Sequence, residues 1–258
     1  GKIDVRTGKP YPKYKNSGME WLGVVPEGWD HTRLRRVCKV YSGGTPSKEI
    51  EAYWKDGTIP WLASGEVNKR KIFQSETFIT EEGYRKSSAK WIPPKSLIIA
   101  LAGQGKTKGM VATIEIQMTG NQSLAAIIPR NNLMNYEFLG LYLEAKYKMI
   151  RGMVGDDIRD GLNLEHIKSI PIPILPIHIQ EQIVKYLNIN NSSFEKSIKK
   201  IQAEIQLLLE FRSRLIADVV TGKVDVRNIN INAKDASDAM DEGVEEEAEI
   251  NEIPESET

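Results

Sequence analysis

Between residues 178 and 221 apolar residues recur in alternating steps of four and three, in a stretch without Pro or Gly. The intervening positions carry mostly Lys, Glu, Gln, Arg and Ser. This heptad pattern predicts one long helix over residues 177–221, with a narrow apolar seam for a coiled coil. Unbroken, it would be about 60 Å long at ~1.5 Å per residue. The seam residues are Ile183, Leu187, Phe194, Ile198, Ile201, Ile205, Leu208, Leu215 and Val219.

Two polar residues, Asn191 and Arg212, interrupt the seam, and polar groups at such positions often fix the pairing register. Because a helix this long is not stable alone in water, we expect it to pair with a partner helix. The alternative is a long core helix of an ordinary domain. Helix propensity is low over residues 188–193, so we expect a kink or break there.

Ahead of the helix, residues 29–176 alternate strand-like runs with helical patterns and predict a globular α/β (α+β) domain. We expect helices over residues 136–151 and over residues 164–169, the second capped by Asn163 and ended by Pro171. The Pro-rich residues 170–176 predict a stiff extended connector, and residues 1–28 an irregular arm. The strand-like runs are residues 35–41, 71–79, 96–102, 110–118 and 123–129.

Charge is distributed unevenly, although the 35 Lys and Arg balance the 35 Asp and Glu. Residues 232–258 carry eleven acids and one base, which leaves 34 basic and 24 acidic residues in the rest of the chain. The tail lacks aromatic residues and is expected to be disordered. The remaining part has a net charge of +10, which suggests an anionic partner.

Cys38 is the only cysteine, so the chain has no intramolecular disulfide and no cysteine-rich zinc site. The three histidines lack metal-ligand spacing to one another or to Cys38, and no metal site is expected. No apolar run approaches the ~20 residues of a membrane span, and no signal-peptide core is present. We therefore expect a soluble, cytoplasmic protein.

Catalytic motifs are scarce, and the closest to one is Gly105-Lys106-Thr107 after an apolar run. It imitates a phosphate-binding loop, but Ala100 stands at the first glycine and a strand-like segment follows where a helix should start. A flexible basic hairpin that offers Gln104, Lys106 and Lys108 to an anion fits better. A nucleotide-binding enzyme and a coiled-coil scaffold without a nucleic-acid role remain the alternatives.

Basic and small polar residues otherwise gather in the loops of the domain. For each basic residue taken alone, the simplest interpretation is a solvated surface charge. As a set they fit a face that meets a phosphate backbone and reads bases. The candidate DNA-binding residues are Ser42, Gly43, Gly44, Thr45, Ser47, Lys48, Ser64, Lys69, Arg70, Gln104, Lys106, Lys108 and Arg159.

The chain opens with Gly1-Lys-Ile-Asp-Val-Arg6, and directly after the helix it reads Gly222-Lys-Val-Asp-Val-Arg227, within a box over residues 222–231. The two hexapeptides differ only by the methylene that separates Ile3 from Val224. This is the pattern expected for one unit of a tandem array when the sequence shared by neighbouring units is kept at both ends.

Several short sequence boxes, which follow one another in the family's order, resemble one target-recognition domain of a type I restriction-modification specificity subunit. The resemblance covers residues 1 to about 228. Where many relatives have an apolar hairpin, this chain has Gly103–Gly109, which alters the expected target and not the role. The boxes are residues 21–29, 41–47, 59–62, 79–83, 87–90, 121–122, 167–173, 180–182, 215–216 and 220–227.

The resemblance implies a non-catalytic DNA-binding subunit that docks on methyltransferase subunits, which recruit a restriction subunit. S-adenosylmethionine and ATP would then be bound by the partners, and no cofactor by this chain. Full-length members carry two such domains and two antiparallel helices. One of each here implies a half-subunit whose two copies pair as a homodimer and read an interrupted palindrome in double-stranded DNA.

Overall fold

The computed structural model describes residues 2–103, 105–130, 132–154 and 161–227. The chain divides into two units, residues 1–192 and residues 193–258, so the predicted limits after residues 28 and 176 fall inside the first unit. In chain order the elements are β1 (Tyr14–Asn16), β2 (Val24–Pro26), β3 (Asp30–Arg33), α1 (Leu34–Val37), β4 (Cys38–Ser42), η1 (Glu51–Tyr53), β5 (Ile59–Leu62), η2 (Ser64–Lys69), β6 (Lys71–Ile72), β7 (Thr77–Ile79), α2 (Glu81–Arg85), β8 (Ser96–Ala100), β9 (Val111–Ile114), β10 (Thr119–Gly120), β11 (Leu124–Pro129), α3 (Tyr136–Ala145), α4 (Tyr147–Arg151), α5 (Leu164–Ser169), β12 (Pro171–Ile174) and α6 (Ile177–Val220).

A five-stranded sheet in the order β4-β11-β8-β9-β6 forms the centre of the first unit, and only β6 and β9 pair in parallel. Along β8, Leu97 and Ile99 pack into one apolar cluster, while Ile98 and Ala100 pack into another. Both faces of the sheet are therefore buried. This explains why the predicted strand reads as an unbroken apolar run rather than an alternating one.

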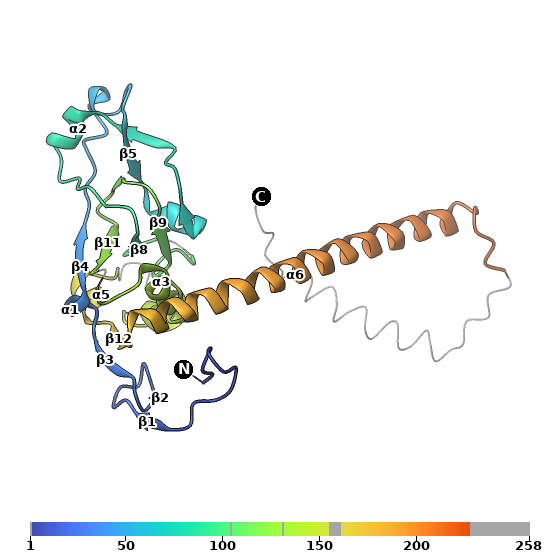
Figure 1. Ribbon diagram of the computed structural model, residues 1–258. Helices are drawn as coiled ribbons and strands as arrows, with labels where there is room; N and C mark the ends of the chain where they lie inside the picture. Colours follow the sequence, from blue (N-terminus) through green and yellow to red (C-terminus); the bar gives the residue numbers. More distant parts are fainter. Residues whose placement is uncertain (1, 104, 131, 155–160, 228–258) are drawn as a thin grey trace. The chain divides into compact units, whose positions relative to one another are not determined.

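Helices cover one face of this sheet. Phe138 of α3, Ile167 of α5 and Val184 of α6 belong to the same buried cluster as Leu97. The other face is covered by η2 and by the smaller sheet β10-β5-β7, which contributes Leu62. The smaller sheet and α2 lie at one end of this unit and the β1–β2 ladder at the other (Figure 1). The mixed α/β prediction is confirmed, together with the long C-terminal helix.

Helix α5 confirms the predicted cap at Asn163. The Asn163 Oδ1 atom accepts a hydrogen bond from the backbone N–H of His166 at 2.9 Å. The backbone N–H of Asn163 in turn donates to His166 Nδ1 at 3.3 Å. His166 is thus half of a capping box, which gives it a structural role at the start of the helix.

Two predicted strands are wrong in extent. Residues 35–41 begin in α1, and only β4 is extended. Residues 71–79 form two strands, β6 and β7, in different sheets. The buried Ser75 hydroxyl divides them, because it donates to the carbonyl of Trp61 at 2.7 Å and to that of Thr77 at 2.9 Å. These side-chain bonds replace the ladder bonds of a continuous strand.

Three further predicted elements end elsewhere. The run over residues 110–118 ends as β9 at Ile114, and Met118 returns only in an isolated bridge to Ile92. The helix over residues 136–151 breaks at Lys146, whose φ of −98° and ψ of 9° separate α3 from α4. The Pro-rich connector is strand β12, which pairs with β3. Proline suits this two-stranded edge, since it donates no ladder bond.

Helix α6 begins in the first unit and is fixed there by the fully buried Gln180. Its Oε1 accepts from the N–H of Asn135 at 2.8 Å, and its Nε2 donates to the carbonyls of Leu175 at 2.8 Å and Leu133 at 3.1 Å. One side chain thereby joins the first turn of α6 to the segments before it and before α3.

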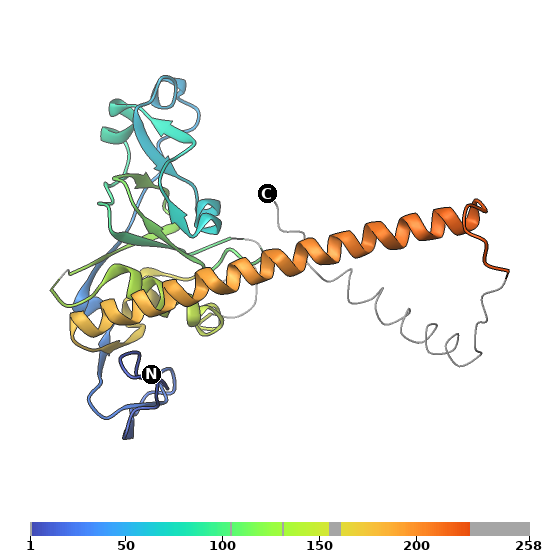
Figure 2. The same cartoon turned by 45° about the vertical axis from the view of Figure 1, so that its right-hand side comes forward.

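The helix continues without a break through residues 188–193 (Figure 2), so the predicted break there is wrong. Six seam residues from Phe194 to Leu215 are between 45% and 63% exposed. They have no packing partner within the described chain, and the coiled coil therefore stays a prediction. Among the described residues, none of the helices has the length and apolar character needed to cross a membrane.

We predict that Gln180→Leu destabilises the first unit, because it leaves the buried carbonyl of Leu175 and two part-buried backbone groups without their partners. An unsatisfied buried group costs about 1–3 kcal/mol, and the part-buried groups can turn to water, so we expect a loss of about 1–3 kcal/mol. Thermal unfolding followed by circular dichroism would show a Tm lowered by several degrees. Gln182→Leu, at an exposed position of the same helix, is the matched control. Equal Tm values for the two variants would contradict the assigned role.

Candidate functional site

The loop after β4 contains two glycines that are buried against other backbone. A Cβ on Gly43 would lie 1.8 Å from the carbonyl oxygen of Gly120, and one on Gly44 would lie 2.1 Å from Ser88 Oγ. Gly44 also donates its N–H to Gly120 O at 2.9 Å. Only glycine permits this close approach. Gly43 and Gly44 are therefore structural, and their burial removes them from the candidate DNA ligands.

The rest of this loop is held by side chains and faces solvent. Thr45 Oγ1 donates to Gln122 Oε1 at 2.5 Å, and Trp54 Nε1 donates to the carbonyl of Ser47 at 2.9 Å. Ser42 and Thr45 are half-buried, while Ser47 and Lys48 are exposed. In the part of the chain that the structure describes, no carboxylate is within ion-pair distance of Lys48. Its ammonium group is available to an anion.

The second predicted loop, η2 and the residues after it, holds cations that already have partners. Lys69 Nζ lies 2.8 Å from Glu66 Oε2 and 2.8 Å from Glu76 Oε1. Hydrogen bonds to Glu66 and then to Glu76 raise the pKa of Lys69 above its ordinary value. Ser64 at the start of this loop is half-buried. A phosphate approaching Lys69 must compete with two carboxylates.

Arg70 has an unusual backbone, with φ of 57° and ψ of −46°. Positive φ is rare outside glycine, and such residues are over-represented at functional sites. The Arg70 carbonyl accepts from the N–H of Thr113 at 2.8 Å, which ties this conformation to β9. Its exposed guanidinium lies 2.9 Å from Glu144 of α3.

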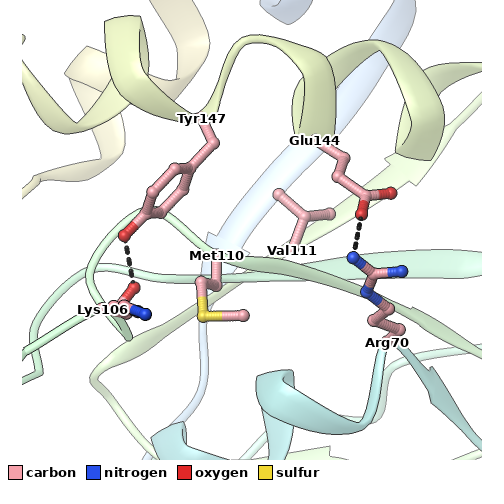
Figure 3. Close-up of a pocket in the computed structure, with 7 residues that line it drawn as sticks. Arg70, Lys106, Met110, Val111, Glu144 and Tyr147 are labelled. Atoms are coloured by element: carbon pink, nitrogen blue, oxygen red, sulfur yellow. Dashed lines mark hydrogen bonds and ion pairs between the residues drawn. The ribbon is translucent and has the colours of Figure 1, made fainter. Parts of the chain in front are cut away.

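The hairpin between β8 and β9 is tied to α4. Tyr147 Oη donates to the carbonyl of Lys106 at 2.6 Å (Figure 3), and Arg151 Nη1 donates to that of Gly105 at 2.5 Å. These bonds join the described residues of the hairpin to α4. Lys108 is 6% exposed and has an interaction partner, so it too is removed from the candidate DNA ligands. Gln104 lies outside the described residues.

A pocket of about 230 Å³ brings two of the predicted loops together. Arg70 from the η2 loop and Lys106 from the hairpin both line it, with Glu144 and Tyr147 on the opposite wall (Figure 3). No ion pair of Lys106 is found within the described chain. The pocket is therefore lined by Lys106, which has no ion pair within the described chain, and by Arg70, which is paired with Glu144. These two residues come from loops that are far apart in sequence.

The predicted ligand Arg159 lies outside the described residues. The segments on either side of its loop are fixed near the hairpin: Arg151 donates to Gly105, and the N–H of Leu162 donates to the carbonyl of Leu101 at 2.7 Å.

The alternative of a nucleotide-binding loop has no support in this geometry. The hairpin is followed by strand β9, and the N–H of Gly109 donates to the carbonyl of Ala100 at 2.9 Å. No helix N-terminus therefore follows Thr107 to face a phosphate. Over residues 2–103, 105–130, 132–154 and 161–227, no three His, Cys, Asp or Glu side chains are grouped to hold a metal ion.

Sequence reasoning missed the residues that shape this surface, Gln122, Glu144 and Tyr147. Gln122 belongs to the Asn121-Gln122 box, which was a usable signal for its contact with Thr45. Glu144 and Tyr147 carry no such signal, because their contacts with Arg70 and Lys106 cross between distant segments.

Residues 26–207 match the protein family described as the type I restriction modification DNA specificity domain. The Escherichia coli type I restriction enzyme EcoR124I/EcoR124II specificity subunit is 29% identical over 204 residues, covering 75% of this chain and 46% of that protein. The MjaIX specificity subunit of Methanocaldococcus jannaschii is 26% identical over 189 residues, covering 71% and 42%. The chain thus spans about half the length of the curated relatives it matches.

Solved structures show the same fold. A chain from a study of complex assembly and conformational transition in the type I R-M system superposes with a TM-score of 0.58 at 19% identity, covering 80% of this chain and 47% of that one. The HsdS subunit from Thermoanaerobacter tengcongensis superposes with a TM-score of 0.53 at 18% identity, covering 80% and 46%.

We predict that Gly44→Ala destabilises the first unit, because the added methyl group would overlap Ser88. Overpacking of this kind costs about 1–3 kcal/mol or more. Gly65→Ala is the control, since nothing lies within 4 Å of its Cβ position. Urea unfolding should show a lowered midpoint for Gly44→Ala alone. A Gly44→Ala midpoint equal to that of the unsubstituted protein would contradict the close approach.

Proposed function

The chain belongs to the family of type I restriction modification DNA specificity domains, and on that premise we propose that it recognises double-stranded DNA for a type I restriction-modification complex. The family match over residues 26–207 carries the proposal. It is supported by the loops described above, which present free and paired cations on one folded unit.

In this proposal three kinds of group meet the DNA. Lys48 and Lys106 neutralise phosphates without giving up an internal ion pair. Lys69 and Arg70 exchange a carboxylate for a phosphate or a base edge, which makes their contribution depend on geometry as well as charge. Ser42, Thr45, Ser47 and Ser64 supply hydroxyls within hydrogen-bonding reach of the same surface. Gln104 and Arg159 complete the proposed set.

The chain has no catalytic task in this proposal. Methylation of the target belongs to methyltransferase subunits that bind S-adenosylmethionine, and ATP-driven cleavage to a restriction subunit that joins through the complex. Recognition and chemistry are then divided between chains. A DNA-recognition subunit works where the DNA lies, which makes the cytoplasm its proposed location.

Two copies of the chain form the working unit in this proposal. The exposed seam of α6 supports it, because six large apolar side chains on one helix favour burial against another helix. Each copy reads one half-site, and two-fold symmetry of the protein implies an interrupted palindrome in the DNA. The helices set the distance between the half-sites.

We predict that Lys48→Ala and Lys106→Ala each reduce the magnitude of the slope of log affinity against log salt by about 1.8, the value for two lost phosphate contacts, one in each copy of the proposed dimer. Lys69→Ala should change the slope less, because two carboxylates already neutralise its ammonium. Fluorescence anisotropy with duplex DNA containing the methylated site of the complex measures this.

The control for this titration is Lys13→Ala, an exposed lysine in the arm. Unchanged slopes for both Lys48→Ala and Lys106→Ala would remove these loops from the interface. Binding of DNA without any salt dependence, or no binding by a dimeric protein, would favour the scaffold alternative.

We predict that Ile201→Asp combined with Leu208→Asp converts the protein from a dimer to a monomer of 29.1 kDa. Two carboxylates per seam cannot be buried without partners, so the helices separate. Multi-angle light scattering measures the mass. Ile189→Asp replaces an apolar residue that is 63% exposed and outside the seam, and it should leave the dimer intact. A dimeric mass for the double variant would exclude the seam as the interface.

A further inference from the structure

Two exposed lysines, Lys39 and Lys90, lie over the ring of the same tyrosine, Tyr41. The ammonium group of Lys39 is 5.4 Å from the centre of that ring, and the ammonium group of Lys90 is 5.8 Å from it. The two lysines are far apart in the sequence, and the fold brings both to one side chain. Neither belongs to the candidate DNA-binding residues drawn from the sequence.

The ring of Tyr41 is fixed by contacts with both sheets. It lies on β4, an edge strand of the five-stranded sheet, and packs half-buried against the apolar cluster that contains Ile98. Its hydroxyl donates to the carbonyl of Trp91 at 2.5 Å, and Trp91 packs against the apolar cluster of the smaller sheet. Burial raises the pKa of Tyr41, so the phenol stays protonated and keeps this bond at neutral pH.

An aromatic ring positions a cation without neutralising it. The face of the ring attracts an ammonium group through its quadrupole, but the ring carries no net charge. Throughout residues 2–103, 105–130, 132–154 and 161–227, no carboxylate lies within ion-pair distance of Lys39 or Lys90. Both ammonium groups therefore keep their full charge beside a fixed ring.

The basic segment 69–71 shows the opposite arrangement, because each of its cations is paired with a carboxylate. The pairs are Lys69 with Glu66 and Glu76, Arg70 with Glu144, and Lys71 with Glu137. Three cations there share four carboxylates, so the segment offers a phosphate no excess of positive charge. Two cations that share an uncharged ring attract an anion more strongly.

Lys39 and Lys90 flank the loop after β4. Lys39 lies within β4, which ends at Ser42, where the loop begins. On the other side, a Cβ on Gly44 would lie 2.1 Å from Ser88 Oγ, two residues before Lys90. The two ammonium groups are therefore next to the loop that carries the unpaired Lys48. Their mutual repulsion is relieved by an anion that binds beside both of them.

We propose that Lys39 and Lys90, positioned by Tyr41, form a further site for the phosphates of a DNA strand, beside the loop that carries Lys48. This rests on the DNA-binding function proposed above and adds two cations and their ring to the interface. Successive phosphates of one strand are about 3.4 Å apart along the helix axis, so two cations at one ring can contact neighbouring phosphates. Such contacts orient the DNA and strengthen binding for all sequences alike.

Lys39→Gln combined with Lys90→Gln tests the site on the full chain, because glutamine keeps much of each side chain and removes its charge. We expect the slope of log affinity against log salt to fall in magnitude by about 1.8 for each chain that binds, the value for two lost phosphate contacts. Fluorescence anisotropy should show this loss with the methylated site and with an unrelated duplex. Lys13→Gln, at an exposed position of the arm, is the control and should leave the slope unchanged.

Tyr41→Phe and Tyr41→Leu test the positioning role of the ring. Both variants lose the hydroxyl bond to Trp91, but only leucine also removes the ring from the two lysines. Well below the Tm of both variants, Tyr41→Leu should bind DNA about 2- to 5-fold more weakly than Tyr41→Phe, the range expected for an exposed cation–π contact. Equal affinities would show that the ring serves folding alone.

The outcomes separate this site from the proposed function. If the Lys39→Gln, Lys90→Gln variant has the slope of the unsubstituted protein while Lys48→Ala lowers it, the site is overturned and the function stands. A lowered Tm with an unchanged slope would overturn the site as well, because the lysines would then act only in folding. Absence of salt-dependent DNA binding by the unsubstituted protein would overturn the function, and the site with it.

Discussion

The buried core of the first unit includes α6 as far as Val184, yet the apolar stripe of the helix runs on to Val219. Seam residues in that stretch are roughly half exposed, and no segment of the described chain covers them. Such a surface is costly in water, because apolar area gains about 25 cal/mol per Å² on burial. The proposed function depends on how this stripe is covered, since in that proposal the helix that pairs with α6 sets the separation of the proposed DNA-binding surfaces.

In the first unit, by contrast, the loops are held in place by contacts within the unit. The loop after β4 is fixed by backbone contact at Gly43 and Gly44, and the hairpin before β9 by Tyr147 and Arg151. A loop already ordered loses less conformational entropy on binding. Carboxylates at Lys69 and Arg70 hold these cations in position as well. In the proposed function their internal partners are exchanged on binding, which favours a ligand that offers matching geometry over a merely anionic one.

The sequence predicts correctly those features that depend on interactions between residues close together in the chain. The Asn163 cap and the heptad stripe of α6 involve neighbours within a few residues, and both were predictable. The division of residues 71–79 depends on a tertiary contact, that of Ser75 with Trp61, which no local pattern reveals. In the candidate site the same rule applies. Sequence placed Arg70 and Lys106 in basic loops, but it could not show that both line one pocket, that Lys108 is buried, or that Gly43 and Gly44 serve packing.

Both copies of the repeated hexapeptide contain the same clasp between aspartate and arginine. Arg6 Nη2 lies 2.6 Å from Asp4 Oδ2, and Arg227 Nη2 lies 2.7 Å from Asp225 Oδ2. In both copies the arginine N–H also donates to the aspartate Oδ1, and the side-chain hydrogen bond from arginine holds the pKa of each carboxyl below its ordinary value. Asp4 is buried and Asp225 is exposed, so the surroundings do not impose this clasp. The Asp-x-Arg sequence therefore forms the same clasp in two different settings, once in the arm and once directly after α6.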